Sequence, residues 1–67
     1  MTKKKPEVPG SYMVEISTVD ENQRSYNDHT YYIEDADGAS DAIKKAEGKL
    51  RPSETVVKVR AVLLLQG

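Results

Sequence analysis

Three groups of side chains in this sequence have the chemistry to act on another molecule. Lys58 and Arg60 alternate within an apolar C-terminal stretch, where they could make charge-assisted hydrogen bonds to carboxylates. Four carboxylates gather in a second stretch and could offer oxygen ligands to a divalent cation: Glu34, Asp35, Asp37 and Asp41. The single histidine, His29, directly follows Asp28 and could serve as a general base if a partner oriented it.

The acidic group and His29 have simpler explanations than metal binding or catalysis. The acids lack the spacing of a Ca²⁺-binding loop, and carboxylates at the start of a helix cap it and complement its dipole. Asp28 and His29 are neighbours on a predicted strand, so their side chains point to opposite faces. The sequence has no cysteine, no glycine-rich phosphate loop and no paired histidine ligands. We therefore predict that the chain is not an enzyme and holds no metal or cofactor.

Lys58 and Arg60 belong to a stretch, residues 54–65, whose apolar content and branched side chains predict a β-strand. Read with a period of two, one face enters the core and holds Val57, Val59, Ala61, Leu63 and Leu65. The other face holds the two cations between Val56, Val62 and Leu64. We predict that this second face binds a partner, with the three apolar side chains surrounding the two cations.

Two more strands and a helix precede that strand. Residues 11–19 alternate and predict a strand with Tyr12, Val14, Ile16 and Thr18 on one face. The polar residues 20–28 predict a long loop, and residues 29–34 predict a second strand. A helix follows, capped by Asp37 or Gly38 and ended by Pro52, with one apolar face made of Ala39, Ala42, Ile43, Ala46 and Leu50.

The order strand, strand, helix, strand predicts an α+β domain with β-β-α-β topology. The strands form a three-stranded antiparallel sheet in the order 2-1-3, with the helix packed on one face. The domain spans residues 11–67, and residues 1–10, with Lys3–Lys5 and two prolines, form a flexible basic tail. One helix leaves the other face open, with Met13 and Glu15 beside the predicted partner-binding residues. The apolar end at Leu63–Gln66 lies on a sheet edge, which makes a homodimer a second hypothesis.

Composition narrows the classes of partner and compartment. The net charge is −1, built from +3 in residues 1–5, −8 in residues 7–41 and +4 in residues 42–67. The acidic middle would repel phosphates, which disfavours direct nucleic-acid binding. No apolar run approaches the roughly 20 residues of a membrane span, and the basic start is not followed by a signal-peptide core. We expect a cytoplasmic protein that binds another protein and no membrane.

Two stretches resemble the small RNA polymerase inhibitors of T7-like bacteriophages. They are Tyr32–Glu47, where an acidic turn leads into the helix, and Val57–Arg60, with basic residues at alternate positions of the last strand. The resemblance covers most of Met13–Val62. It implies that Lys58 and Arg60 grip an acidic surface of the polymerase β′ jaw.

It also implies that Glu34, Asp35, Asp37 and Asp41 form an acidic strip in the downstream DNA channel. The chain departs from this family where Lys58 replaces an arginine, in Lys44 and Lys45 of the helix, and in its apolar end.

Three other functions stay open on the sequence. The first is a DNA-mimicking inhibitor of a repair enzyme such as uracil-DNA glycosylase, since small size, many strands and acidity are shared with that class. The second is a structural homodimer joined through the closing strand. The third is a small nucleic-acid-binding domain that stacks bases on its tyrosines, against which the acidic middle of the chain counts.

Overall fold

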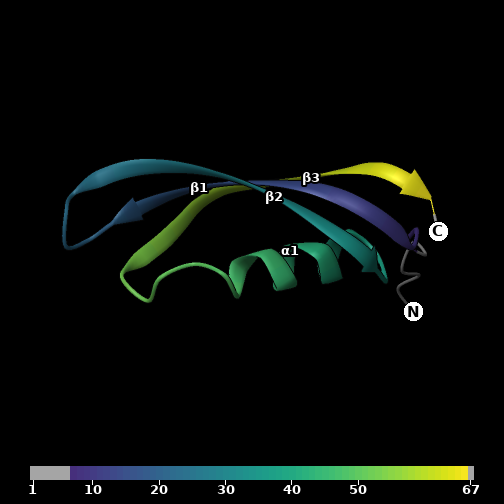
Figure 1. Ribbon diagram of the computed structural model, residues 1–67. Coiled ribbons are helices and arrows are strands. Elements are labelled where there is room, and N and C mark those ends of the chain that lie inside the picture. The colour runs from purple at the N-terminus through teal and green to yellow at the C-terminus, as the bar shows by residue number, and fades with distance from the viewer. Residues whose placement is uncertain (1–6, 67) are drawn as a thin grey trace, which may run out of the picture.

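The computed structural model of the chain describes residues 7–66. Three strands, β1 (Gly10–Asp20), β2 (Ser25–Ala36) and β3 (Glu54–Gln66), form an antiparallel sheet in the order β2-β1-β3. The helix α1 (Ala39–Glu47) connects β2 to β3 and lies against one face of the sheet (Figure 1). The predicted β-β-α-β fold is therefore confirmed. Within residues 7–66, no helix has the length and apolar content needed to cross a membrane.

The central strand β1 shows the alternation that its sequence predicts. Its even-numbered side chains, Tyr12, Val14, Ile16 and Thr18, are buried on the helix side, and its odd-numbered ones are half-buried on the other side. The helix contributes the fully buried Ala42 and Ala46 to the same core. These two alanines let the backbone of α1 approach the sheet closely. The apolar side chains of β1 therefore fill the space between the helix and the sheet.

The connection between β1 and β2 is a tight turn, and the prediction of a long loop is wrong. Residues 25–28 pair with residues 17–20 of β1, which leaves only residues 21–24 outside the strands. The buried Asp20 explains this, because its Oδ1 accepts hydrogen bonds from the backbone N–H groups of Asn22 (2.9 Å) and Gln23 (3.2 Å). Arg24 completes the turn in the left-handed region, with φ 54°. A polar sequence here forms a turn because its donors are satisfied locally.

The start of α1 is held by a carboxylate from the N-terminal segment. The N-cap residue Gly38 offers no side chain, and the Glu7 carboxylate accepts hydrogen bonds from Ser40 N (3.3 Å) and Ser40 Oγ (2.6 Å). A Cβ at Gly38 would collide with the Glu7 side chain. Tyr12 Oη donates to the Val8 carbonyl, so residues 7 and 8 of the predicted tail contact the domain. Residues 1–6, with the Lys3–Lys5 cluster, lie outside the described residues.

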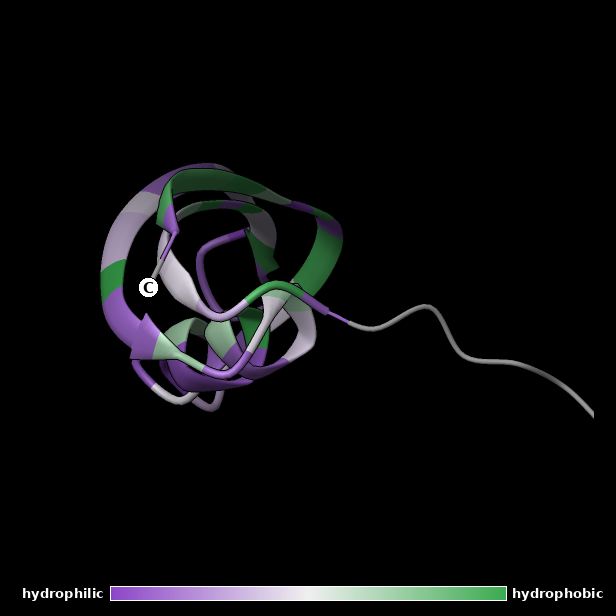
Figure 2. Ribbon diagram, turned by 90° about the vertical axis from the view of Figure 1, so that its right-hand side faces the viewer, coloured by the Kyte–Doolittle hydropathy of each residue, from purple (hydrophilic) through white to green (hydrophobic). Residues whose placement is uncertain are grey.

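The strand β3 contains two irregularities that the period-two pattern misses. Its pairing with β1 is regular from Lys58, opposite Ser17, to Leu63, opposite Tyr12, and shifts by one residue at each end. Val57 and Leu64 are the extra residues of these two bulges. Each bulge exchanges the faces of the residues beyond it. The last residues of β3 form an apolar ribbon at the rim of the molecule (Figure 2).

The bulges correct three assignments. Val56 lies opposite the buried Thr18 and packs against the core, so it does not belong to the partner-binding face. Val57 is 54% exposed instead of entering the core. Leu65 lies opposite Ser11 on the side away from the helix. The helix also ends earlier than Pro52 predicts, at Glu47, with Gly48 as its C-cap.

Candidate functional site: the open face of the sheet

The sheet face opposite α1, called the open face below, carries the two cations of β3. Strand pairing arranges the open face in three rows that run from β2 across β1 to β3. These rows are Asp28–Ser17–Lys58, Thr30–Glu15–Arg60 and Tyr32–Met13–Val62. The first two rows are polar and the third is apolar. The open face thus places the cations of β3 beside an apolar row and opposite carboxylates of β1 and β2.

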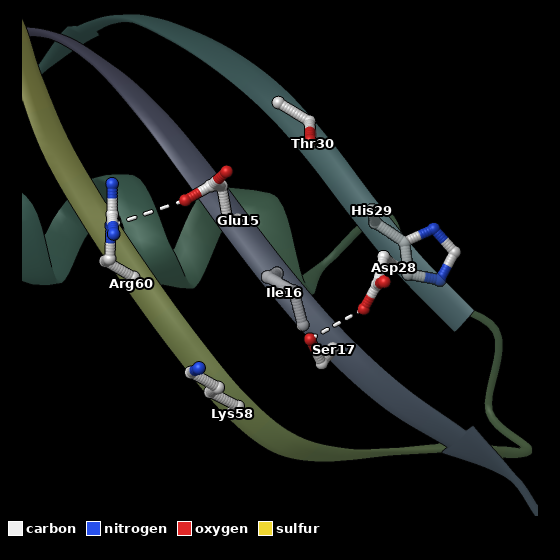
Figure 3. Close-up of a pocket in the computed structure, with 8 residues that line it drawn as sticks. All are labelled: Glu15, Ile16, Ser17, Asp28, His29, Thr30, Lys58 and Arg60. Carbon is white, nitrogen blue, oxygen red and sulfur yellow. Dashed lines mark hydrogen bonds and ion pairs between the residues drawn. The ribbon is translucent and has the colours of Figure 1, made fainter. Parts of the chain in front are cut away.

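The two polar rows surround a shallow hollow of about 280 Å³ (Figure 3). Carboxylates of Glu15 and Asp28 line it from β1 and β2, and Lys58 and Arg60 line it from β3. Ser17 Oγ donates a hydrogen bond of 2.8 Å to Asp28 Oδ1 across the two strands. This bond occupies one oxygen of Asp28. The hollow therefore presents a cationic side on β3 and an acidic side on β1 and β2 to a molecule that docks on it.

Arg60 is only partly engaged within the chain. Its Nε lies 3.3 Å from Glu15 Oε1, and the two side chains are 65% and 45% exposed. A solvent-exposed ion pair of this kind contributes between about 0 and 1 kcal/mol to stability. Because the contact uses Nε, the terminal nitrogens of the guanidinium can donate to a second carboxylate. Among the described residues, Lys58 forms no ion pair and its side chain is exposed.

The apolar surround of the cations differs in part from the predicted one. Val62 lies beside Met13 as expected, and Leu64 is half-exposed in the second bulge. Tyr32, 69% exposed next to Met13, belongs to the apolar part of the open face, whereas Val56 does not. The run Tyr31-Tyr32-Ile33 predicts a strand but does not indicate which of its faces is buried. In the structure, Ile33 is buried and Tyr32 is exposed.

The predicted acidic strip lies at a different place, the corner between β2 and α1. Glu34 and Asp35 are among the last residues of β2, which ends at Ala36, and Asp35 has a positive φ of 58°. Asp41 Oδ2 accepts a hydrogen bond from Asp37 N (2.9 Å) and an ion pair from Lys45 Nζ (3.1 Å). The Asp37 N–H, followed by Lys45, lowers the pKa of Asp41 below its ordinary value of 3.8.

The structure gathers the four acids around this corner but does not bring them to the hollow that Lys58 and Arg60 line. Within residues 7–66, no three His, Asp or Glu side chains are arranged to hold a metal ion.

A second polar cluster, which no pattern in the sequence indicates, lies on the helix side beyond the end of α1. Glu54, 5% exposed, accepts from Thr18 Oγ1 (3.0 Å) and contacts His29 Nε2 (2.7 Å) through Oε1, and accepts from Arg51 N (3.1 Å) through Oε2. The Arg51 N–H, followed by His29, lowers the pKa of Glu54 below its ordinary value of 4.5. The ring of His29 stacks on Tyr31. His29 is thus a half-buried link between β2 and β3.

Comparisons of the chain with protein-family models, with curated proteins and with solved structures gave no match.

Proposed function

We propose that this chain is a small protein-binding module whose open face docks on an acidic surface of another protein. The observation that carries the proposal is the placement of Lys58 and Arg60, which extend from a sheet face that the chain's own helix does not cover. The apolar row Tyr32–Met13–Val62 lies directly beside them. The residues that dominate binding energy at specific interfaces are enriched in arginine and tyrosine and are surrounded by contacts that exclude water.

The partner that the resemblance suggests is the β′ subunit of bacterial RNA polymerase. The chain would then be a phage-type inhibitor that acts in the host cytoplasm. Two features support this proposal: the fold has the strand-strand-helix-strand order of that family, and two basic residues alternate on the open face of its last strand.

The two cations would contribute to binding in different ways. The terminal nitrogens of Arg60 can donate two parallel hydrogen bonds to one carboxylate, while Nε lies beside Glu15. Lys58 adds a compact charge without such a fork, so it attracts an acidic partner more than it orients it. The carboxylates of Glu15 and Asp28 sit on the other side of the hollow and disfavour partners with a uniform negative charge, such as a nucleic acid.

The acidic corner would serve a separate step. If the open face holds the polymerase, Glu34, Asp35 and Asp37 project from the end of β2 and the start of the helix connection. Carboxylates at that place would repel template phosphates from the downstream channel.

A binding measurement with purified bacterial RNA polymerase tests the main step. The chain is immobilised, and the double variant Lys58→Ala with Arg60→Ala is compared with a control that removes two cations from the helix side, Lys44→Ala with Lys49→Ala. We expect the open-face variant to bind at least about tenfold more weakly, because charge-assisted contacts at an interface are worth well over 1.4 kcal/mol together. Equal loss in both variants would mean that net charge, not the open face, governs binding.

A transcription assay tests the acidic corner independently. The triple variant Glu34→Gln, Asp35→Asn and Asp37→Asn keeps the open face intact, so we expect it to bind polymerase as the unaltered chain does. It should inhibit promoter-dependent transcription less, because the carboxylates that repel DNA are gone. Full inhibition by this variant would remove the acidic strip from the mechanism. Binding of uracil-DNA glycosylase in place of polymerase would instead favour the repair-enzyme inhibitor.

A further inference from the structure

We propose that two copies of this chain pair antiparallel through their β3 strands, around a two-fold axis at Ala61, to form one continuous six-stranded sheet. The proposal concerns the edge of the sheet and leaves the open face uncovered. It therefore stands or falls separately from the proposed binding of a partner protein by Lys58 and Arg60.

The edge formed by β3 is long and apolar. The strand spans Glu54–Gln66 and has β1 on one side only. Val59 and Leu63 lie on the helix side opposite Ile16 and Tyr12, yet they are 37% and 40% exposed, whereas their neighbours in β1 are buried. The helix side of the core thus ends in an uncovered apolar strip at this edge. Figure 2 shows the same strand as an apolar ribbon along the rim.

The stretch of β3 between its two bulges has one of the usual protections of an edge, the charges of Lys58 and Arg60 on the open face, and lacks the others. Natural edge strands discourage pairing with prolines, bulges or charges that point inward. From Lys58 to Leu63 the ladder is regular, no residue is proline, and the helix-side positions Val59, Ala61 and Leu63 are all apolar. The opposite edge, β2, carries Asn27 and His29 on its helix side. The large exposed side chains of β2, Tyr26 and Tyr32, are aromatic with a polar hydroxyl, so β3 is the edge that offers an aliphatic surface to a second copy.

Symmetry and charge select the register. A two-fold axis perpendicular to the sheet keeps both helices on one side and pairs the residue at the axis with itself. An axis at Ala61 places Val59 opposite the second copy's Leu63, so the exposed apolar strips of the two copies cover each other twice. Arg60 then lies opposite the second copy's Val62. Both pairs fall within the regular stretch between the bulges.

Neighbouring registers are worse. An axis at Val59 places Lys58 opposite the second copy's Arg60 twice, and an axis at Arg60 places the two arginines opposite each other. Like charges directly opposite on a sheet are destabilising. An axis at Val62 brings the bulged Leu64 opposite Arg60 and breaks the ladder there. An axis at Ala61 avoids opposed like charges and keeps residues 59–63 of both copies in a regular ladder, with the bulged Leu64 opposite Lys58 only at its end.

The joined sheet would bring four cations, Lys58 and Arg60 of each copy, onto one continuous open face. The two Arg60 side chains become diagonal neighbours about 7–8 Å apart, each with its own Glu15 beside it. Their repulsion opposes pairing and is screened by salt. Association should therefore tighten as ionic strength rises, the opposite of what an interface held by ion pairs would show.

Sedimentation equilibrium with the full chain tests the proposal. We expect the apparent mass to rise from 7.5 kDa toward twice that value between about 1 μM and about 1 mM protein, and to rise further when salt increases from about 50 to about 500 mM. Leu63→Lys should weaken the dimer at least about tenfold, whereas Tyr32→Lys, the same change at an exposed site of the other edge, should not. Circular dichroism shows that each variant is folded. A monomer at every concentration would overturn the proposal and leave this edge to an extended segment of another protein.

Cysteine cross-linking tests the register. The sequence has no cysteine, so a single introduced thiol can react only with its copy in another molecule. At the axis, side chains of Ala61→Cys would lie with Cβ atoms about 4.5–5.5 Å apart, close to disulfide geometry. Under mild oxidation this variant should form disulfide dimers at least about tenfold faster than Thr30→Cys on the β2 edge. Equal rates for the two would contradict pairing around Ala61.

Discussion

The two faces of this sheet differ in where their polar side chains find partners. On the helix side, polar groups find partners within the chain: among the described residues, every buried side-chain nitrogen or oxygen has a hydrogen-bond partner. On the open face, Lys58, most of Arg60 and the ring of Tyr32 meet water. A side chain on the first face contributes mainly to stability, and one on the second is available to another molecule. Substitutions can therefore separate folding from binding.

The helix side itself is closed in two ways. Under α1, Val14 and Ile16 pack against Ala42 and Ala46. Beyond the end of the helix, where no apolar element covers the strands, Glu54 closes the same face through hydrogen bonds from other strands and the Arg51 backbone. A nine-residue helix cannot cover strands of eleven to thirteen residues, so polar contacts complete the layer.

The largest expected effect is the loss of a core side chain. Ile16→Ala should lower the free energy of unfolding by about 2–5 kcal/mol, because the cavity under α1 adds to the lost apolar burial. That is a large share of the stability of so small a domain. Urea denaturation measures it, with Met13→Ala on the open face as the matched control. Equal destabilisation by both would contradict the division between the faces.

A smaller effect is expected at Glu54. Glu54→Ala would remove the acceptor of the Arg51 N–H and leave the hydroxyl of buried Thr18 only longer contacts, such as the one to the Asn27 carbonyl (3.5 Å), and poorly satisfied donors are costly. The melting temperature should fall by less than in Ile16→Ala and by more than in Glu34→Ala, which removes an exposed carboxylate. A melting temperature unchanged from that of the unaltered chain would show that the cluster only occupies space.

The lowered pKa values of Glu54 and Asp41 predict an acid-sensitive fold. A carboxyl with a lower pKa in the folded state adds stability that is fully present above its ordinary pKa and is lost as pH falls through the folded value. For Glu54 and Asp41 the loss begins as pH falls below 4.5 and 3.8 respectively. Urea denaturation between about pH 7 and pH 3 should show it, and Glu54→Gln should flatten the curve. The same slope in that variant would assign the acid sensitivity to other carboxyls.

The smallest expected effect on stability within the fold is at the helix start. Glu7→Ala removes the acceptor for Ser40 N and should cost about 0.5–1 kcal/mol, the usual range for a lost cap. Glu7→Gln keeps an acceptor and should cost less. If both variants match the unaltered chain in urea denaturation, the contact between the N-terminal segment and α1 does not stabilise the helix.

Regular patterns in the sequence predict the fold, and local irregularities limit prediction of the site. The alternation of β1 and the three-and-four spacing of Ala42 and Ala46 place the core correctly. Bulges at Val57 and Leu64 leave no trace in hydropathy, so Val56 was assigned to the wrong face. The tight hairpin depends on one buried carboxylate.

The link between His29 and Glu54 joins residues 25 positions apart, a distance at which a single sequence carries no pairing signal. Lys58 and Arg60 were placed correctly because both lie between the bulges, where the period of two holds.

The most direct test of the account follows the backbone amide resonances of the ¹⁵N-labelled chain during addition of purified bacterial RNA polymerase. We expect amides of the open face around Arg60, Glu15 and Met13 to broaden first, and the broadening to disappear in the variant Lys58→Ala with Arg60→Ala. That variant should remain folded, because the ion pair that it loses, between Arg60 and Glu15, is exposed to solvent. Broadening centred on α1, or an unchanged spectrum at every ratio, would contradict the claim that the open face binds this partner.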